Sequence, residues 1–400
     1  MLGTCTTRPL SVAFYFPSGA AGAGRSRPVH LTGWKARPPR IDVLRARGVT
    51  RGTSSQWLPG HSPRNRAKDA SGGWFVRDLC GRARWEDDRS MFFDKYGEMQ
   101  HQVTGGGQEA EDGTKTGGKP EIDRSALRDI LLGSIPPGKI KWGHHLTQVT
   151  FTADNQLPVL HFGNGITASG FALVVGADGA WSKVRAAITS IKPQYAGLNF
   201  IETSIQPSNA LHEKLAQKIG HGIALFLAGP SRMVIQRQGD NSYRIYFGIT
   251  APEHFVGTEI DLKDVQSTRQ VLLSTFFHDW ADELKDYIRR ADNFRSWPLY
   301  QLPADELIWS SVPGVTLAGD AAHLSLPNGQ GVNLAMTDAF ELTSKIAHYG
   351  IEKVNQAVAE YERDALIRGV HHIKDGEKMN NIMAHPDGVK GVLKVFSGAE

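Results

Sequence analysis

A strand, a glycine-rich turn and a helix follow one another around residue 320, and their residue types suit a ligand that gains negative charge. The string from Gly314 to Asn333 is GVTLAGDAAHLSLPNGQGVN. A helix that begins after such a turn presents unpaired N–H groups and a partial positive charge. The carboxylate of Asp320, at the strand end, can accept hydrogen bonds from sugar or ribitol hydroxyls. An ordinary capped loop is the alternative, but three glycines and an amide at this spacing favour a binding turn.

A second polar segment follows an apolar strand in the middle of the chain. The apolar run at 171–175 is typical of a strand buried on both faces, and it leads into Asp178 and Gly179. A strand that ends in Asp-Gly and opens a helix with Ser182 and Arg185 can hold a phosphate-bearing ligand. Asp-Gly also marks ordinary turns, so this segment alone is a moderate signal.

A third segment is a helix predicted over residues 123–132, with its apolar residues on one face and Asp123 as the N-cap. Arg124 lies at its start. An arginine on a helix is usually solvated, so this segment is weak by itself.

In this order and at this spacing, the three segments resemble motifs of the group A FAD-dependent monooxygenases, the p-hydroxybenzoate hydroxylase superfamily. The resemblance implies that Asp320 binds the ribitol of FAD and that the loop after it lies against the isoalloxazine ring. Many members have one more residue between the proline and Gly-Gln-Gly, so this loop is the shorter form. The implied cofactor residues are Arg124, Asp178, Gly179, Gly319, Asp320, Pro327, Gly329, Gln330, Gly331, Val332 and Asn333.

Across residues 82–375 the chain resembles the branch that contains the tetracycline-inactivating monooxygenases and fungal relatives. Glu202 and Tyr246 stand where the tetracycline enzymes present Gln and His, so we do not expect a tetracycline substrate. With Arg232, these two residues are candidates for the substrate pocket, and solvated or packed sheet positions are an equal alternative. We expect His323 to pack in the loop rather than to catalyse.

The resemblance implies an oxidoreductase. NADPH or NADH would reduce FAD, the reduced flavin would take O2 to a C4a-hydroperoxide, and one oxygen would pass to an aromatic or polyketide-like small molecule. The cofactor carries such chemistry, so we nominate no general base. A flavin-dependent reductase or dehydrogenase on the same fold is the alternative enzyme. A remnant that cannot hold FAD is the non-enzymatic one.

The N-terminal 75 residues differ from the rest of the chain. They hold 12 Lys or Arg against two acids, and we find no sustained helix or strand period in them. The family would open with Gly-x-Gly-x-x-Gly, but Arg27 stands where the third glycine belongs after Gly22 and Gly24. Codons compatible with residues 56–75, read one base downstream, can encode a family-like segment. We therefore infer an out-of-frame stretch, which would remove the pyrophosphate cradle and the central strand and weaken FAD binding.

Composition limits the other function classes. Residues 76–400 hold 33 bases and 39 acids, so a nucleic-acid partner is not expected, and a nucleic-acid-binding or targeting role for the basic arm ranks low. Cys5 and Cys80 cannot form a disulfide framework, which favours a reducing compartment, the cytoplasm. No apolar run is long enough to span a membrane. We expect no metal site and a monomer that binds a small organic substrate and O2.

The predicted fold is α/β (α+β): a Rossmann-like FAD-binding domain, incomplete at its N-terminus, with an inserted mixed or antiparallel β-sheet substrate domain and C-terminal helices. A hairpin is predicted at 146–162, antiparallel strands within 195–255, one helix at 267–290, a buried strand at 315–317, and helices at 331–347 and 351–373. The predicted divisions are 1–75 irregular, 76–190 FAD-binding with substrate-sheet strands near 82–103, 191–305 substrate domain, 306–350 FAD-binding, and 351–400 helical.

Overall fold

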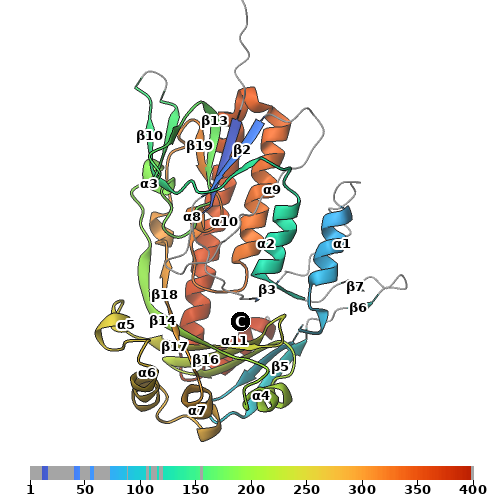
Figure 1. The fold of residues 1–400 in the computed structure, drawn as a ribbon, viewed down its shortest axis with the longest axis vertical. Coiled ribbons are helices and arrows are strands. Elements are labelled where there is room, and N and C mark those ends of the chain that lie inside the picture. The colour runs from blue at the N-terminus through green and yellow to red at the C-terminus, as the bar shows by residue number, and fades with distance from the viewer. Residues whose placement is uncertain are drawn as a thin grey trace, which may run out of the picture.

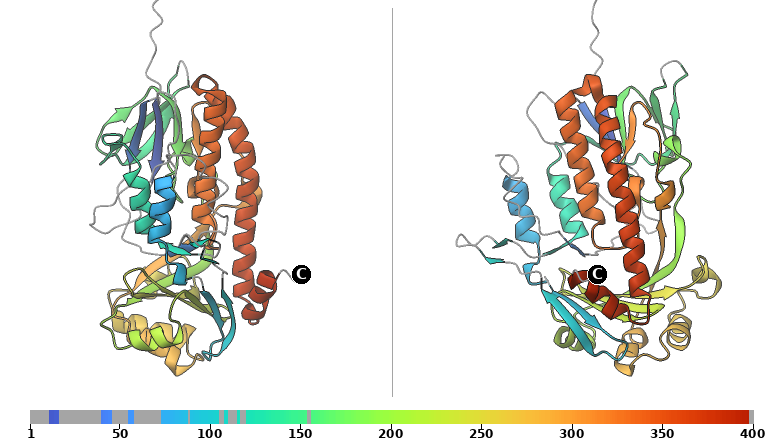
Figure 2. Two further views of the ribbon diagram at one scale, coloured as in Figure 1. Left: turned by 90° about the vertical axis from the view of Figure 1, so that its right-hand side faces the viewer. Right: turned by 180° about the vertical axis from the view of Figure 1, so that it is seen from behind.

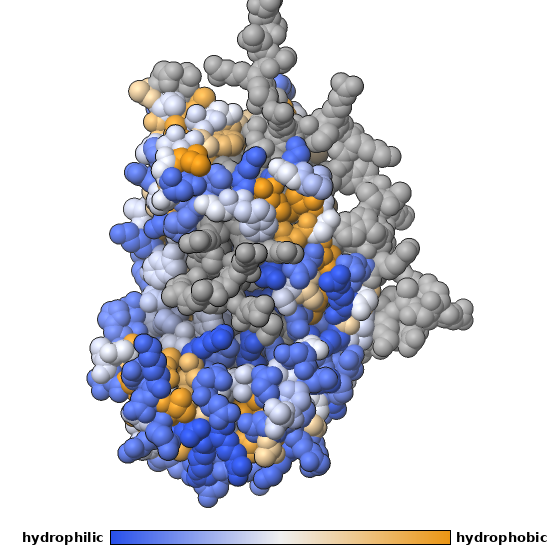
Figure 3. All heavy atoms as spheres, viewed as in Figure 1, coloured by the Kyte–Doolittle hydropathy of each residue, from blue (hydrophilic) through white to orange (hydrophobic). Residues whose placement is uncertain are grey.

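The structure, a computed structural model, places a parallel sheet at one end and a larger sheet at the other, with long helices between them (Figure 1). It describes residues 11–16, 40–45, 55–57, 73–87, 89–104, 108–109, 115–116, 120–153 and 156–397. Among these residues no helix is both long and apolar enough to cross a membrane. The end that carries the larger sheet has a mainly hydrophilic surface with small apolar patches (Figure 3).

The parallel sheet has five strands in the order β19-β13-β1-β2-β9, and every neighbouring pair is parallel. β13 lies between β19 and β1, and its apolar run is buried as predicted for residues 171–175, apart from the half-buried Ala172. Parallel strands covered on both faces favour continuous apolar sequence, which explains this run. The strands are β1 (Ser11–Phe16), β2 (Arg40–Arg45), β9 (Ile140–Lys141), β13 (Phe171–Gly176) and β19 (Val315–Leu317).

Strands within the first 75 residues correct the prediction that this region lacks regular elements. β1 pairs with β13 on one side and β2 on the other, so the prediction of a missing central strand is also wrong. A third strand, β3 (Ser55–Trp57), pairs with β8 (Glu121–Asp123). Short runs rich in β-branched and aromatic residues adopt strands when neighbours pair with them, without a longer period. The segment around Gly22 lies outside the described residues.

The larger sheet has seven strands in the order β18-β14-β17-β16-β15-β4-β5, and we call it the substrate sheet. All neighbours are antiparallel except β15 and β4. The antiparallel strands predicted within 195–255, and those near 82–103, are confirmed. The strands are β4 (Arg89–Phe93), β5 (Met99–Thr104), β14 (Gln194–Ile205), β15 (Ile223–Ala228), β16 (Ser231–Arg237), β17 (Tyr243–Thr250) and β18 (Arg295–Gln301).

One face of the substrate sheet packs on short helices. Ile201, Met233 and Phe247 form a buried cluster with residues of α4 (His212–Lys218), α6 (Val265–Val271) and α7 (Asp282–Arg289). The single helix predicted at 267–290 is therefore wrong in extent: a π-helical turn, η3 (Leu272–Phe276), follows α6, and α7 begins separately at Asp282. Phe277 and Trp280 fill the break and are buried in the same cluster.

Two long helices lie between the two sheets. The last of them, α10 (Val354–Met383), runs beside α9 (Gly331–Tyr349) and reaches from the parallel sheet to the substrate sheet (Figure 2). It is followed by α11 (Gly388–Ser397), whose Val389 and Val392 pack on Phe92 and Leu227 of the substrate sheet. The C-terminal helix predicted at 351–373 is confirmed and extends further.

The remaining elements are shorter or peripheral, and the predicted hairpin at 146–162 is confirmed. They are α1 (Gly73–Arg82), α2 (Arg124–Gly133), α3 (Arg185–Ile188), α5 (Phe255–Thr258), α8 (Asp320–His323), β6 (Gln108–Glu109), β7 (Lys115–Thr116), β10 (Leu146–Phe151), β11 (Pro158–Phe162), β12 (Thr167–Ala168), and the 3-10 turns η2 (Trp85–Asp87), η4 (Ala304–Glu306) and η5 (Ile351–Lys353).

Candidate active site

The turn between β19 and α8 is held from below by a buried carboxylate. Asp338 of α9 is fully buried and accepts a hydrogen bond from the Gly319 N–H at 2.8 Å. It also forms an ion pair with Arg368 at 3.2 Å. Gly319 has φ 61°, and a Cβ there would lie 3.2 Å from that of Ala335. The turn is thus fixed by residues behind it, and Asp320, the first residue of α8, keeps an exposed side chain.

His323 lies beneath the same turn. It is 1% exposed, and its Nε2 lies 2.6 Å from Asp338 Oδ2. A Cβ at Gly369 of α10 would come within 2.8 Å of its Cβ, so the helix presses closely on it. This placement is that of a packing residue.

The start of α9 faces outward without a neutralising group. Its N-cap, Gln330, makes no side-chain cap hydrogen bond, and the first turn holds no acidic residue. Gly329 has φ 79°, and the Gln330 N–H donates to the Asn328 side chain at 3.0 Å. Pro327, Gly329 and Gln330 are exposed, and the next three residues are half-buried. A 19-residue helix with this start offers a partial positive charge to an electron-rich ligand.

The carboxylate of Asp178 is used within its own turn. It is 2% exposed and accepts hydrogen bonds from Ser182 Oγ, from Lys183 N at 2.6 Å and from Val184 N at 3.3 Å. Burial raises its pKa although these donors act in the opposite direction. Gly179 has φ 73°, which glycine adopts readily. Asp178 therefore contributes to a ligand site through the shape of the turn.

Arg185 joins this turn to the one after β19. Its guanidinium is buried and donates to the carbonyl oxygens of Ala321 at 3.0 Å, Ile191 at 3.3 Å and Ala180. Burial lowers its pKa, and the charges of Asp178 and Asp320 raise it. The sequence suggested a phosphate ligand for Arg185, whereas the structure gives it three backbone partners. The contact with Ala321 could not be predicted from the sequence, because the two residues lie 136 positions apart.

Arg124 stands between the turn and the substrate sheet. Its side chain is exposed, yet desolvation by the surrounding protein lowers its pKa. The charges that act on it come from Asp320, which raises the pKa, then Tyr246, which raises it, and Arg244, which lowers it. Arg124 therefore lies near Asp320 and Tyr246, and we call the region between these three residues the recess.

The candidate substrate residues share one face of the substrate sheet. Side chains alternate along a strand, so the neighbours of the buried Ile201, Met233 and Phe247 point to the opposite face. Glu202 lies directly opposite Tyr246 in the β14–β17 register. These neighbours are Glu202, Arg232 and Tyr246.

Glu202 already has two partners. Trp297 Nε1 donates to its Oε2 at 2.8 Å, and Arg244 Nε lies 3.6 Å from its Oε1. Tyr246 is half-buried, and burial followed by the charge of Glu202 raises its pKa. Tyr246 thus presents a neutral phenol beside the carboxylate of Glu202, which Trp297 and Arg244 already contact.

Arg232 is packed differently. It is 3% exposed, its Nη2 donates to Asn380 Oδ1 at 2.5 Å, and its guanidinium carbon lies 5.7 Å from the Phe200 ring centroid. Burial lowers its pKa to about 10. A Cβ at Gly248 would lie 2.5 Å from the Phe200 ring and 2.7 Å from Arg232 Cγ. Gly248 therefore leaves room for the side chains of Phe200 and Arg232 to lie over β17. A glycine inside a predicted strand can mark such a close approach, and this was the sequence signal for the contact.

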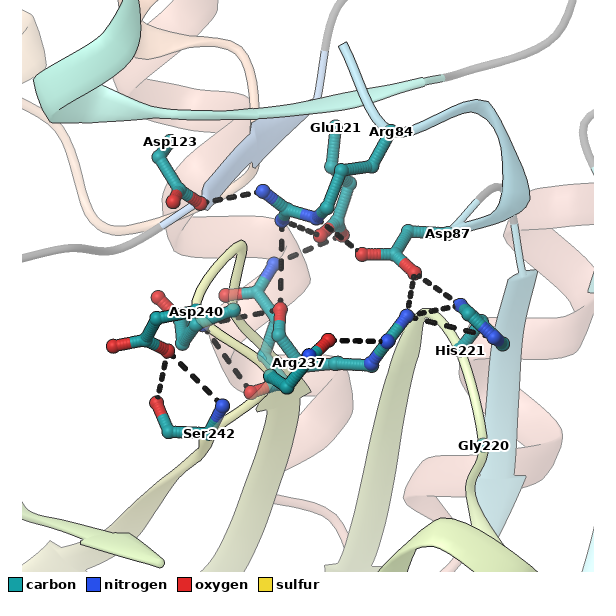
Figure 4. A network of polar contacts seen from close by, with 12 residues as sticks. Arg84, Asp87, Glu121, Asp123, Gly220, His221, Arg237, Asp240 and Ser242 are labelled. Carbon is teal, nitrogen blue, oxygen red and sulfur yellow. Dashed lines mark hydrogen bonds and ion pairs between the residues drawn. The ribbon is translucent and has the colours of Figure 1, made fainter. Parts of the chain in front are cut away.

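A charged network fixes the segment that leads into Arg124 (Figure 4). Arg84 pairs with Asp87, with Asp123 and, at 3.2 Å, with Glu121 Oε2. Gln236 of the substrate sheet donates to the other oxygen of Glu121 at 2.9 Å. β8 is thereby tied to the substrate sheet immediately before α2 begins. No sequence pattern indicated this network, because Arg84 lies 37 positions from Glu121 and 39 from Asp123.

Comparison with known proteins identifies the family of the chain. Residues 137–371 match the family model described as an FAD binding domain, which is more than half of the chain. The chain belongs to this family and is an FAD-dependent oxidoreductase, a group A flavin monooxygenase.

Particular relatives are a little over a quarter identical to the chain over the aligned residues. It is 28% identical over 299 residues to Monooxygenase penA of Penicillium thymicola, covering 62% of this chain and 69% of the relative. It is 27% identical over 316 residues to Monooxygenase asqM of Emericella nidulans, covering 64% and 71%. It is 27% identical over 273 residues to 3-amino-4-hydroxybenzoate 2-monooxygenase of Streptomyces cremeus, covering 67% and 63%.

Solved structures share the fold. HpxO of Klebsiella pneumoniae, complexed with FAD and uric acid, superposes with a TM-score of 0.66 at 19% identity over 90% of this chain and 86% of that one. CtdE in complex with FAD and substrate gives 0.70 at 17% identity over 96% and 92%. The tetracycline destructase Tet(51) gives 0.63 at 17% identity over 98% and 96%.

Proposed function

We propose that this monooxygenase holds the flavin of FAD in the recess and oxygenates an aromatic or polyketide-like small molecule on the substrate sheet, with NADPH or NADH as reductant. The observation that carries the proposal is the position of Arg124. Arg124 is exposed, and the charges of Asp320 on the cofactor side and Tyr246 on the sheet side both act on its pKa.

The residues around the recess suit a flavin. The exposed carboxylate of Asp320 can accept hydroxyl hydrogens of a ribitol chain. The positive end of α9, whose N-cap makes no side-chain hydrogen bond, can stabilise negative charge on the ring edge that gains electrons. Gly319 and Gly329 both have positive φ, which glycine adopts readily, so the two turns keep their sharp backbone paths. FAD, when bound, supplies electron transfer and O2 activation, and the chain supplies position and electrostatics.

The face of the substrate sheet suits an aromatic, oxygen-bearing molecule. Phe200 and Tyr246 lie with ring centroids 5.8 Å apart and offer apolar contact. The Tyr246 hydroxyl and Arg232 offer hydrogen-bond donors, while Glu202 is engaged by Trp297. We propose these as the substrate-facing groups, in an enzyme that acts as a monomer in the cytoplasm.

The test uses the purified full-length chain. We expect a yellow protein that retains FAD and consumes O2 with NADPH or NADH when a substrate is present. NAD(P)H oxidation by an added electron acceptor, with no oxygen from O2 in the product, would favour a reductase instead. A colourless protein that takes up no added FAD would contradict the proposal. Gel filtration tests the monomer.

A further inference from the structure

The helix α10 packs against the loop that leads from the Gly-Asp turn to α9, and His372 contacts this loop at two points. The His372 carbonyl oxygen accepts a hydrogen bond from Ser325 Oγ at 3.1 Å, and its Nδ1 lies 3.2 Å from Asn328 Nδ2. Gly376, one turn further along α10, permits this approach, because a Cβ there would overlap Ser325 Oγ and lie 3.0 Å from the next carbonyl oxygen of the loop. His372 is therefore the residue through which α10 holds the loop.

The hydrogen bonds of Asn328 fix the direction of its amide. Its Oδ1 accepts a hydrogen bond from the Gln330 N–H at 3.0 Å, and a backbone N–H can only donate. The oxygen is thus committed to Gln330, and Nδ2, which also only donates, is the atom turned toward His372. His372 Nδ1 must accept this hydrogen bond, so the imidazole carries no proton on that nitrogen.

Protonation of His372 would break this chain of hydrogen bonds. With a hydrogen on Nδ1, the imidazolium and the Asn328 amide would present two donors to each other. A flip of the amide would turn its oxygen to His372, but it would then set Nδ2 against the Gln330 N–H, which is again a donor. Since Gln330 is the N-cap of α9, either arrangement loses one of the two hydrogen bonds that join α10 to the start of α9.

The charged groups around His372 come from α8, α9 and α10 itself. Burial has the largest effect on the pKa of His372 and lowers it, and the charge of His323, whose ring centroid lies 5.8 Å away, lowers it further. The charges of Asp320, Asp375 and Asp338 raise the pKa, and the net shift is downward. His372 is therefore neutral at pH 7, the form that the hydrogen bond from Asn328 requires.

We propose that neutral His372 is a positioning residue for the cofactor: through Asn328 it holds Gln330 and the start of α9 where the flavin binds. The inference rests on the proposed function for the position of the flavin. It adds that FAD affinity depends on the protonation state of a residue on α10, a helix outside the sequence motifs of the site.

The test measures the dissociation constant of FAD by fluorescence titration of the FAD-free full chain between pH 8 and pH 5. As the pH falls below the ordinary histidine pKa, the parent should bind FAD about twofold to tenfold more weakly, the range of one lost hydrogen bond. His372→Asn should not show this loss, because its Oδ1 stands where Nδ1 stands in histidine and accepts at every pH. An equal loss in His372→Asn, or no loss in the parent, overturns the proposal.

Two further variants test whether the effect passes through Asn328. Asn328→Asp replaces the donating amide by a carboxylate, which prefers the protonated imidazole, so the loss of FAD affinity on acidification should disappear. The neighbouring His371 is exposed, and His371→Asn should keep the pH dependence of the parent. A loss retained in Asn328→Asp, or abolished in His371→Asn, contradicts the proposal.

Hydrogen exchange gives a readout that needs no cofactor. In the FAD-free chain at pH 7, exchange of the Gln330 amide reports its hydrogen bond to Asn328. His372→Leu removes the acceptor behind Asn328 and should speed this exchange about twofold to tenfold, whereas His372→Asn should leave it as in the parent. Unchanged exchange in His372→Leu overturns the proposal.

The two readouts separate this inference from the proposed function. A chain that binds no FAD at any pH, but whose Gln330 amide exchanges faster in His372→Leu, would reject the proposed function and support the positioning of the loop by His372. FAD binding that is the same at pH 8 and pH 5, with unchanged exchange, would do the reverse.

Discussion

Two arginines at the substrate-sheet end of the molecule have opposite surroundings. Arg84 is surrounded by Asp87, Glu121 and Asp123 (Figure 4), whereas Arg232 meets an amide and an aromatic ring. The cost of burying Arg84 is offset by the chain itself, and that of Arg232 is not. Two arginines at the same end of the molecule can therefore differ completely in the counter-charges that the described residues give them.

Removal of Arg84 should have the largest effect. Arg84→Met would leave the buried carboxylates of Asp87 and Glu121 without their main counter-charge, so we expect a loss of about 3–5 kcal/mol in the free energy of unfolding. Urea denaturation measures it. Arg82→Met, which removes an exposed pair with Asp78, should change stability by less than about 1 kcal/mol. Equal effects of the two variants would show that the network in Figure 4 is not a structural clamp.

Gly248→Ala tests the crossing that brings Arg232 to Phe200. The new methyl group would meet the Phe200 ring at 2.5 Å and Arg232 at 2.7 Å, so we expect about 1–3 kcal/mol of destabilisation. Thermal unfolding measures it. Gly133→Ala, where nothing lies within 4 Å of the new atom, should be neutral or slightly stabilising. A neutral Gly248→Ala would mean that the two side chains can move aside freely.

Asp320→Asn probes the cofactor side. The side chain is exposed, so the variant should unfold at the same temperature as the parent without FAD. Loss of a charged acceptor should weaken FAD binding by about tenfold, the lower end of the range for hydrogen bonds to charged groups. Fluorescence titration with FAD measures the affinity. Unchanged FAD affinity would remove Asp320 from the cofactor site.

Protonation of His372 should have the smallest effect on stability. This residue shows a third way in which a buried basic side chain can be accommodated. Like Arg232 it is buried and contacts an amide, Asn328 at 3.2 Å, but a histidine can avoid the cost of burial by losing its proton. Burial, and then the charge of His323, lowers its pKa. The unfolded chain therefore binds the proton more readily, and stability should fall as pH decreases below the ordinary histidine pKa.

For one group the slope is at most about 1.4 kcal/mol per pH unit. Urea denaturation between pH 8 and 5 measures it, with His372→Gln as the comparison. A variant whose stability depends on pH as the parent's does would show that another group is responsible.

The elements predicted from the sequence are those with strong local signals. The apolar run of β13, the Gly-Asp turn before α8 and the long α9 follow from residues close together in the chain. β1 and β2 were missed because each is a short run in an arginine-rich region and is defined by pairing with distant strands. Local pattern cannot supply a partner that lies elsewhere in the sequence.

The supports of the candidate site were missed for the same reason. Asn380 lies 148 positions from Arg232 in sequence, and Gln236 lies 115 positions from Glu121. Neither contact can be predicted without knowing how the two sheets and α10 are arranged in space. Sequence patterns located Arg124, Asp178 and Asp320, and only the structure shows that the carboxylate of Asp178 folds its own turn.

The length of α10 has a consequence for how this protein can change. Near its start Tyr361 Oη donates to the carbonyl oxygen of Leu317, beside the Gly-Asp turn, and near its end Asn380 binds Arg232. A single residue deleted between these two points would rotate the amide by about 100° around the helix axis and draw it about 1.5 Å closer. An insertion or deletion there would therefore break one of these two contacts, so α10 can keep both only at its present length.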